Sequence, residues 1–329
     1  MNSSRKLRIG VYWASSCGGC DISLLEIGEK LLELVEIADI AFWPCVADFK
    51  YATVAAYPDA HLDLCLFNGG IRNSEQEQVA RLLRQKSRTL IAYGTCAADG
   101  GIPALANLYS TGEIFRASYH DNPSIDNPAG VEPCPRVETS VGTLEIPQFY
   151  PAVLRLRDVV DIEYAIPGCP PDAENVWETI AALTSGAVPA HNGDTRIGCN
   201  NRSVCDECKR QKRDVKITTI HRPHQFRPEP EWCLLEQGIL CMGSVTRGGC
   251  DACCPKVNMR CEGCFGPPPG ATDQGASMIG ALSALLDAST ETRARELTAA
   301  IPDPTGTFYR FSMSSSRLKA AHQRDGGSR

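Results

Sequence analysis

Cysteine is concentrated in one part of this chain to a degree that no ordinary hydrophobic core requires. Nine of the 17 cysteines lie within residues 205–264, among them two C-x-x-C pairs, Cys205/Cys208 and Cys261/Cys264. A C-x-x-C pair brings two thiolates within reach of one metal centre, and thiolates bind both zinc and iron-sulfur clusters. The density therefore predicts several thiolate-bound centres, in either an electron carrier or a zinc-stabilised module.

Charge and hydropathy exclude several other roles. The 329 residues carry a formal net charge of -6, which gives no general basic field for nucleic acid. The short basic run K-R-Q-K-R at 209–213 is interpreted as a solvated face. No segment reaches the roughly 18 consecutive apolar residues of a membrane span, and the N-terminus does not resemble a signal peptide. We therefore expect a cytoplasmic protein, in which reduced thiols favour metal ligation over disulfides.

The first 185 residues alternate between strand and helix patterns. Short apolar runs predict strands, and apolar residues at amphipathic spacing predict helices. Strands are expected at 8–14, 38–43, 62–67, 89–93 and 160–166, and helices at 21–35, 74–85 and 172–183. This alternation predicts an α/β fold with a doubly wound parallel sheet.

Four of the cysteines follow strands of this expected sheet. Cys17 and Cys20 come after the first strand, Cys96 after a later one and Cys169 after the last. Because ligands of open α/β sheets bind at the carboxyl ends of the strands, we expect the four thiols to converge, in sufficient number for one iron-sulfur cluster. Glycines at 18, 19, 94, 100, 101 and 168 suit loops that approach a cluster closely.

An ordered series of motifs resembles a known family. The series comprises C-G-G-C-D at 17–21, G-T-C-A at 94–97, P-G-C-P-P at 167–171, W-C-L-L-E-Q-G-I-L-C at 232–241 and C-C-P-K-V-N-M-R-C-E-G-C-F-G-P at 253–267. It is similar to the small, electron-transferring subunit of nickel-iron hydrogenases. The similarity is greatest to the cytosolic F420-non-reducing (methyl-viologen-reducing) kind, which works with heterodisulfide reductase.

The resemblance implies two domains and three 4Fe-4S clusters. A flavodoxin-like domain over residues 1–186 would hold the proximal cluster, and a smaller, irregular, cysteine-rich domain over 187–311 the other two. The implied ligands are Cys17, Cys20, Cys96 and Cys169 for the proximal cluster; Cys205, Cys208, Cys233 and Cys241 for the distal cluster; and Cys254, Cys261 and Cys264 with a fourth ligand for the medial cluster. We expect that fourth ligand to be Cys250, with Cys253 as the rival.

The implied function is electron transfer between a large partner subunit and an external acceptor. The H2-activating nickel-iron centre would lie in the large subunit only, so this chain would contribute no catalytic residue. The expected acceptor is an iron-sulfur or flavin subunit, for which a link to heterodisulfide reductase is one option. The alternatives are a cluster-bearing subunit of a complex I-like oxidoreductase, against which C-G-G-C and the second cysteine region argue, and a zinc-stabilised interaction module.

The remaining segments give weaker expectations. Residues 185–201, rich in Gly, Pro and Asn, are expected to link the domains, and residues 312–329 to form a polar, mobile tail. Cys45 and Cys65 are interpreted as small core residues, whereas Cys134 has no evident partner. Cys199 is interpreted as a spare thiol near the distal site.

Overall fold

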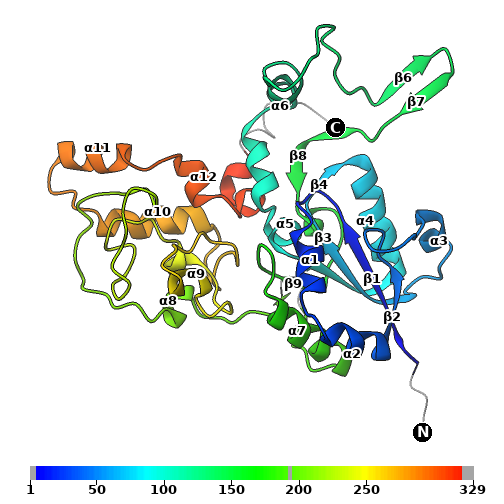
Figure 1. Ribbon diagram of the computed structural model, residues 1–329, viewed down its shortest axis with the longest axis horizontal. Coiled ribbons are helices and arrows are strands. Elements are labelled where there is room, and N and C mark those ends of the chain that lie inside the picture. The colour runs from blue at the N-terminus through cyan, green and yellow to red at the C-terminus, as the bar shows by residue number, and fades with distance from the viewer. Residues whose placement is uncertain (1–4, 192–194, 321–329) are drawn as a thin grey trace.

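The computed structural model describes residues 5–191 and 195–320, and its centre is a parallel sheet of six strands (Figure 1). The strands lie in the order β10-β9-β5-β3-β1-β2. Their bounds are β1 (Leu7–Trp13), β2 (Ala38–Phe42), β3 (Leu62–Asn68), β5 (Ser87–Tyr93), β9 (Tyr164–Ile166) and β10 (Thr195–Arg196). Read from the β2 edge, the first five strands are β2, β1, β3, β5 and β9. Numbered by their order within this sheet they are 2-1-3-4-5, which is the flavodoxin-like order. The predicted α/β class is therefore confirmed.

Helices cover both faces of this sheet because its strands are apolar on both sides. In β3, Leu64 and Leu66 belong to the core on one face, while Cys65 and Phe67 belong to the core on the other, as the two-residue period of a strand requires. The first core is covered by α1 (Gly19–Leu25), α2 (Lys30–Ile37) and α7 (Ala173–Ser185), and the second by α3 (Tyr51–Ala55), α4 (Ser74–Lys86) and α5 (Thr95–Asp99).

The single helix predicted at 21–35 is wrong, because the chain forms two helices there. Gly28 lies between α1 and α2 with φ at 65°, in the left-handed region that glycine adopts without a steric penalty. The amphipathic pattern of apolar residues continues through this turn, so the pattern alone predicted one helix where there are two.

An insertion separates α5 from β9. It contains the 3₁₀ helices η1 (Ile102–Leu108) and η2 (Leu156–Asp158), α6 (Thr111–Tyr119), the hairpin β6 (Arg136–Thr139) and β7 (Gly142–Glu145), and β8 (Phe149–Leu154), which pairs antiparallel with β4 (Ile71–Asn73). The hairpin projects from the body, and all of its strand residues are exposed (Figure 1).

The second half of the chain has little regular structure, as the sequence predicts. Its elements are α8 (Val204–Glu207), η3 (Gly243–Val245), α9 (Cys253–Lys256), α10 (Gln274–Leu285), α11 (Glu291–Ala299), α12 (Pro304–Phe308), η4 (Met313–Ser315) and η5 (Arg317–Ala320). Its apolar core, which includes Met278 and Leu282, also contains Ala104 and Val153 from the insertion. The two halves therefore share buried surface. None of the described helices is both long and apolar enough to span a bilayer.

Two segments differ from their expected roles. Within the expected linker, Thr195–Arg196 forms β10 and pairs with β9 as an edge of the sheet. In the expected tail, Met313 and Ser314 are buried, and the Ser314 hydroxyl donates to the carbonyl of Val153 at 2.7 Å. The tail expectation is thus wrong for residues 312–316, which pack against the insertion, while residues 321–329 lie outside the described part of the chain.

Candidate metal centres

The segments that follow β1, β5 and β9 bring four predicted ligands together, namely Cys17, Cys20, Cys96 and Cys169. Cys20 and Cys96 are buried, Cys169 is half-buried and Cys17 is exposed. Burial raises the pKa of the Cys20 thiol most, and the neighbouring thiols raise it further. Burial likewise raises the pKa of Cys96 to about 12, with contributions from Cys169 and Cys17. The structure therefore gathers the four predicted thiols into one group, named here the proximal group.

Glycines let the loops approach these sulfur atoms. At Gly94, where φ is 82°, a Cβ atom would lie 2.3 Å from the Sγ of Cys20. At Gly101, where φ is 60°, a Cβ atom would lie 2.5 Å from the Sγ of Cys96. A larger residue would therefore occupy space that the thiols need.

If the proximal group holds the iron-sulfur cluster that the sequence predicts, a Gly94→Ala variant is expected to lose iron there. The new methyl group would displace the Cys20 sulfur, and the positive φ adds backbone strain of about 1–3 kcal/mol. Iron content per purified complex measures the effect. The matched control is Gly112→Ala in α6, where an added Cβ meets no atom within 4 Å. Full iron content in Gly94→Ala would contradict the packing argument.

A second group consists of Cys205, Cys208, Cys233 and Cys241, which line one small pocket together with Arg210 and Lys212. Cys205 lies on α8, which is held by a capping box in which Ser203 and Asp206 bond reciprocally. Burial raises the pKa of Cys205 to about 12, with Cys241 adding to the rise and the cation of Lys212 opposing it. This set is named the distal group.

Arg210 holds the backbone around the distal group. Its guanidinium donates to the carbonyl oxygens of Trp232 at 3.0 Å and Glu229 at 2.9 Å, to the carbonyl oxygen of Pro255 at 3.1 and 3.2 Å, and to Oδ1 of Asn258 at 2.6 Å. Trp232 directly precedes Cys233, and Pro255 directly follows Cys254. The fork therefore ties two cysteine-bearing segments together.

A third group, named the medial group, lies between the other two. Burial raises the pKa of Cys264 to about 12, with further contributions from Cys250, Cys169 and Cys254. Burial also raises the pKa of Cys254 to about 12 and that of Cys250 to about 11. Cys261 is buried, and its pKa is raised by burial first and then by Cys241. The structure thus brings Cys250, Cys254, Cys261 and Cys264 near one another.

The two rivals for the fourth medial position differ in placement. Cys250 is half-buried, and its electrostatic effect reaches both Cys264 and Cys254. Cys253 is exposed at the start of α9, with its Sγ 3.9 Å from that of Cys254. The sulfur atoms of Cys253 and Cys254 are thus in contact, and Cys253 raises the pKa of Cys254 more than Cys250 does.

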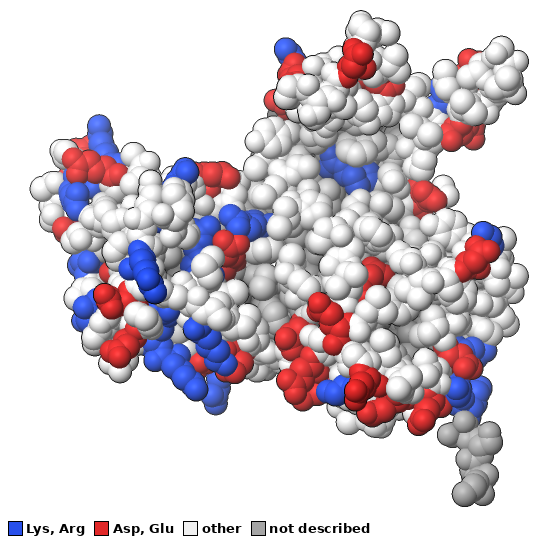
Figure 2. Space-filling model, viewed as in Figure 1, with Lys and Arg blue, Asp and Glu red and all other residues white. Residues whose placement is uncertain are grey.

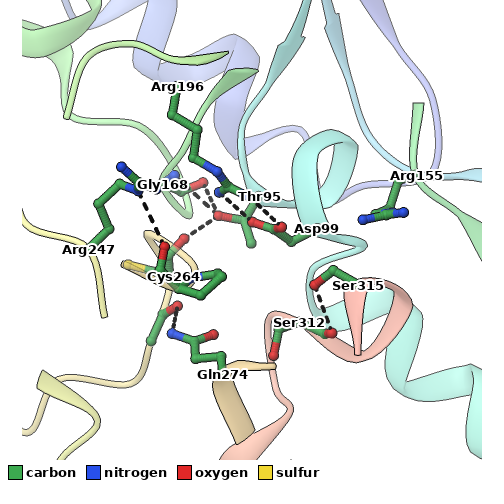
Figure 3. Close-up of polar contacts among 12 residues, drawn as sticks. Thr95, Asp99, Arg155, Gly168, Arg196, Arg247, Cys264, Gln274, Ser312 and Ser315 are labelled. Atoms are coloured by element: carbon green, nitrogen blue, oxygen red, sulfur yellow. Dashed lines mark hydrogen bonds and ion pairs between the residues drawn. The ribbon is translucent and has the colours of Figure 1, made fainter. Parts of the chain in front are cut away.

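Direct contacts connect the three groups in a row. The hydroxyl of Thr95, which precedes Cys96, bonds to the carbonyl oxygens of Gly168 at 2.9 Å and of Cys264 (Figure 3). At the other end, the backbone N–H of Cys261 donates to the Sγ of Cys241 at 3.3 Å. The medial group therefore touches both the proximal and the distal group.

A buried ion pair within the sheet half lies beside these groups. Asp99 on α5 accepts two bonds of 2.7 Å from the guanidinium of Arg196 on β10 (Figure 3). Gly266 packs over this pair, since a Cβ there would lie 2.6 Å from Oδ2 of Asp99. Sequence reasoning missed the pair, because nothing in the local pattern links residues so far apart.

Sequence reasoning also missed several polar residues around the thiols. Asp21 is buried directly after Cys20, and its place in C-G-G-C-D was an available signal. Arg210 and Lys212 belong to the basic run that was interpreted as a solvated face; Lys212 is exposed, but Arg210 is turned inward. Cys65 is buried as expected, whereas Cys45 is exposed. Cys199 packs against Gly249, beside Cys250, rather than against the distal group.

The spacing of the thiols does not suit a single metal ion. Within residues 5–191 and 195–320, no group of three or more His, Cys, Asp or Glu side chains is arranged to hold one.

Comparison with known proteins gives the same picture over nearly the whole chain. A family model described as NADH ubiquinone oxidoreductase, 20 Kd subunit, matches residues 17–183. The iron-sulfur subunit of the F420-non-reducing hydrogenase of Archaeoglobus profundus is 38% identical over 93% of this chain and 96% of its own length. A vhu subunit of the F420-non-reducing hydrogenase of Methanocaldococcus jannaschii is 36% identical over 93% of this chain and 95% of its own length.

A solved structure of the Dm. baculatum NiFeSe hydrogenase covers 81% of this chain and 96% of its own chain, with a TM-score of 0.52 and 18% identity, and supports the fold alone. Fold and relatives together define the small-subunit component of a hydrogenase, an oxidoreductase that acts as part of a complex. The chain belongs to the family of F420-non-reducing hydrogenase iron-sulfur subunits, and its residues 17–183 belong to the matched 20 Kd subunit family. The predicted resemblance is therefore confirmed.

Proposed function

We propose that this chain is the electron-transfer subunit of a nickel-iron hydrogenase complex, passing electrons between the H2-activating site of a large partner subunit and an external acceptor. The observation that carries the proposal is the continuous row of proximal, medial and distal cysteine groups. Contacts of Thr95 with Cys264, and of Cys261 with Cys241, keep neighbouring groups together. A route made of closely spaced redox centres needs this arrangement.

The residues present fit three 4Fe-4S clusters. Each group offers four thiols, the usual ligand number of such a cluster, and Gly94 and Gly101 leave space beside the proximal sulfur atoms. Bound there, the clusters would supply one-electron donors and acceptors. The proposed ligands are Cys17, Cys20, Cys96 and Cys169; Cys250, Cys254, Cys261 and Cys264; and Cys205, Cys208, Cys233 and Cys241. Cys250 is preferred over Cys253 because it is the less exposed and interacts with Cys264.

The proximal group lies at the surface that we assign to the large subunit. Cys17 is exposed there, and so are the large apolar side chains of Trp13, Ile22 and Leu25. Ile22 and Leu25 lie on α1, directly after Cys20. An exposed apolar patch beside a surface thiol is typical of a face that a partner covers.

The opposite end of the row is the proposed exit. The pocket of the distal group is rimmed by Arg210 and Lys212. The acceptor there is proposed to be an iron-sulfur or flavin subunit, with a link to heterodisulfide reductase as one option. A cytoplasmic location likewise stays a proposal.

Metal analysis of the anaerobically purified complex tests the proposal. Three clusters predict about twelve iron atoms and as many acid-labile sulfides bound by this subunit, in addition to the iron of the partner. Expression of this chain with and without its partner separates the two contributions. Stoichiometric zinc in place of iron in this subunit would refute the redox assignment.

The complex I-like alternative has one observation in its favour, the family match over residues 17–183. That match ends before the medial and distal groups, which lie between residues 205 and 264. The curated relatives, by contrast, align over more than nine-tenths of the chain. We therefore retain the hydrogenase assignment.

A further inference from the structure

Behind the proximal group lies a buried carboxylate whose hydrogen-bond partners are neutral. Asp21 is 6% exposed. The indole N–H of Trp43 donates to its Oδ1 at 2.7 Å, and the amide of Asn68 donates to its Oδ2 at 2.6 Å. Both oxygens therefore accept a hydrogen bond from a neutral donor. In the described part of the chain no Lys, Arg or His nitrogen lies within 4.0 Å of it.

Asp21 is placed directly beside the proximal thiols. Asp21 directly follows Cys20 on α1, and both residues are buried there. The side chain therefore lies next to the proximal group in a region from which water is largely excluded.

The distal group has the opposite arrangement. Arg210 donates only to neutral acceptors, namely the backbone carbonyls and the Asn258 side chain described above. It lines the same pocket as the four distal cysteines, and Lys212 stands beside it. Figure 2 shows the same asymmetry on one face of the molecule: Lys and Arg gather around α8, whereas Asp and Glu lie over α2 and α7.

Fixed charges of opposite sign have opposite effects on a redox centre. Reduction adds negative charge, so a nearby anion opposes it and lowers the reduction potential, while a nearby cation favours it and raises the potential. The effect is strongest where water is excluded, because the local dielectric constant is low. Both Asp21 and the guanidinium of Arg210 are at least partly buried.

We propose that Asp21 lowers the reduction potential at the proximal group and that Arg210 raises it at the distal group, so that electrons run outward from the large subunit. This inference rests on the proposed function, because it requires clusters at both groups. It assigns to two side chains that bind no metal the role of setting the direction of flow.

Redox titration of the complex, followed by electron paramagnetic resonance, tests the proposal. Asp21→Asn keeps the size of the side chain and removes its charge, and the Asn68 amide can turn to match the new donor. We expect the ratio of reduced to oxidised proximal cluster, at a fixed applied potential, to rise about tenfold, which is about 59 mV for a one-electron couple. Arg210→Gln is expected to shift the distal cluster by a similar amount in the opposite direction.

Matched variants separate charge from structure. Arg210→Lys loses the fork of hydrogen bonds but keeps the cation, so the distal potential should stay near that of the unmodified complex. Asp39→Asn at the start of β2 and Arg295→Gln on α11 remove exposed charges at positions outside the three groups, and both should leave all potentials unchanged. If Asp21→Asn fails to load a cluster, Trp43→Phe replaces it: this variant keeps the carboxylate and removes a donor, so the proximal potential should fall.

The experiment distinguishes failure of the proposed function from failure of the roles assigned to Asp21 and Arg210. Absence of cluster signals from the unmodified complex would refute the proposed function itself. The role of Asp21 would be overturned if Asp21→Asn showed cluster signals with an unchanged proximal reduction potential. It would also be overturned if the proximal reduction potential of Trp43→Phe were unchanged or raised. An equal shift in Arg210→Lys and Arg210→Gln would overturn the role of Arg210, because hydrogen bonding rather than charge would then explain both.

Discussion

Hydrogen-driven reduction of the acceptor is expected to collapse in a Cys208→Ala variant of the complex, while hydrogen/deuterium exchange at the partner's metal centre persists. Cys208 lines the distal pocket, so its loss removes a proposed ligand at the exit of the row. The fall in acceptor reduction should reach at least the roughly 10–100-fold that loss of a supporting residue costs a metal site. Exchange needs no net export of electrons and should therefore be retained.

Variants of two other cysteines serve as a control and as a contrast for this prediction. Cys134→Ala removes an exposed thiol from the insertion, outside the three groups, and should leave both activities intact. Cys17→Ala, at the face assigned to the large subunit, should reduce assembly of the complex as well as electron transfer. Both assays are run on the same preparations. Full reduction of the native acceptor by Cys208→Ala would show that electrons do not leave through the distal group.

An Asp99→Asn variant is expected to be strongly destabilised. The carboxylate of Asp99 and the guanidinium of Arg196 form two bonds of 2.7 Å, and their side chains are only 1% and 9% exposed. Removing one partner of a buried ion pair costs about 3–5 kcal/mol. The apparent melting temperature of the purified complex should fall by at least about 6 °C.

A surface pair supplies the control for this prediction. Asp48 contacts Lys50 with side chains 83% and 69% exposed, so Asp48→Asn should cost less than about 1 kcal/mol and leave the melting temperature almost unchanged. The double variant Asp99→Leu/Arg196→Met should recover much of the lost stability, because it leaves no buried charge unpaired. Equal melting temperatures for Asp99→Asn and Asp48→Asn would mean that the ion pair does not stabilise the attachment of α5 to β10.

The sequence was sufficient to predict the sheet and the positions of most thiols. Strand–helix alternation is a local pattern, and parallel strands place their carboxyl ends at one edge, so the convergence of Cys17, Cys20, Cys96 and Cys169 followed from chain order alone. The distal and medial sets came from the resemblance. The structure brings the members of each set together, and their assignment as ligands stays a prediction.

What the sequence did not predict depends on contacts between distant residues. The break between α1 and α2 needs the left-handed Gly28, which the amphipathic pattern conceals. The polar serines after residue 311 were taken for a mobile tail because composition says nothing of Asn107 and Val153, to which Ser314 bonds. The half-buried placement of Arg210 was not predicted, because a basic run is usually solvated.

The packing of Met313 and Ser314 against the insertion bears on how the chain folds. Ser314 and Val153 are separated by 161 positions in the chain, so this contact closes a very long loop. Closing long loops costs chain entropy before the contact is gained, so such contacts form after local structure. The apolar core that the two halves share is therefore expected to close late in folding, after the helices on either side of it have formed.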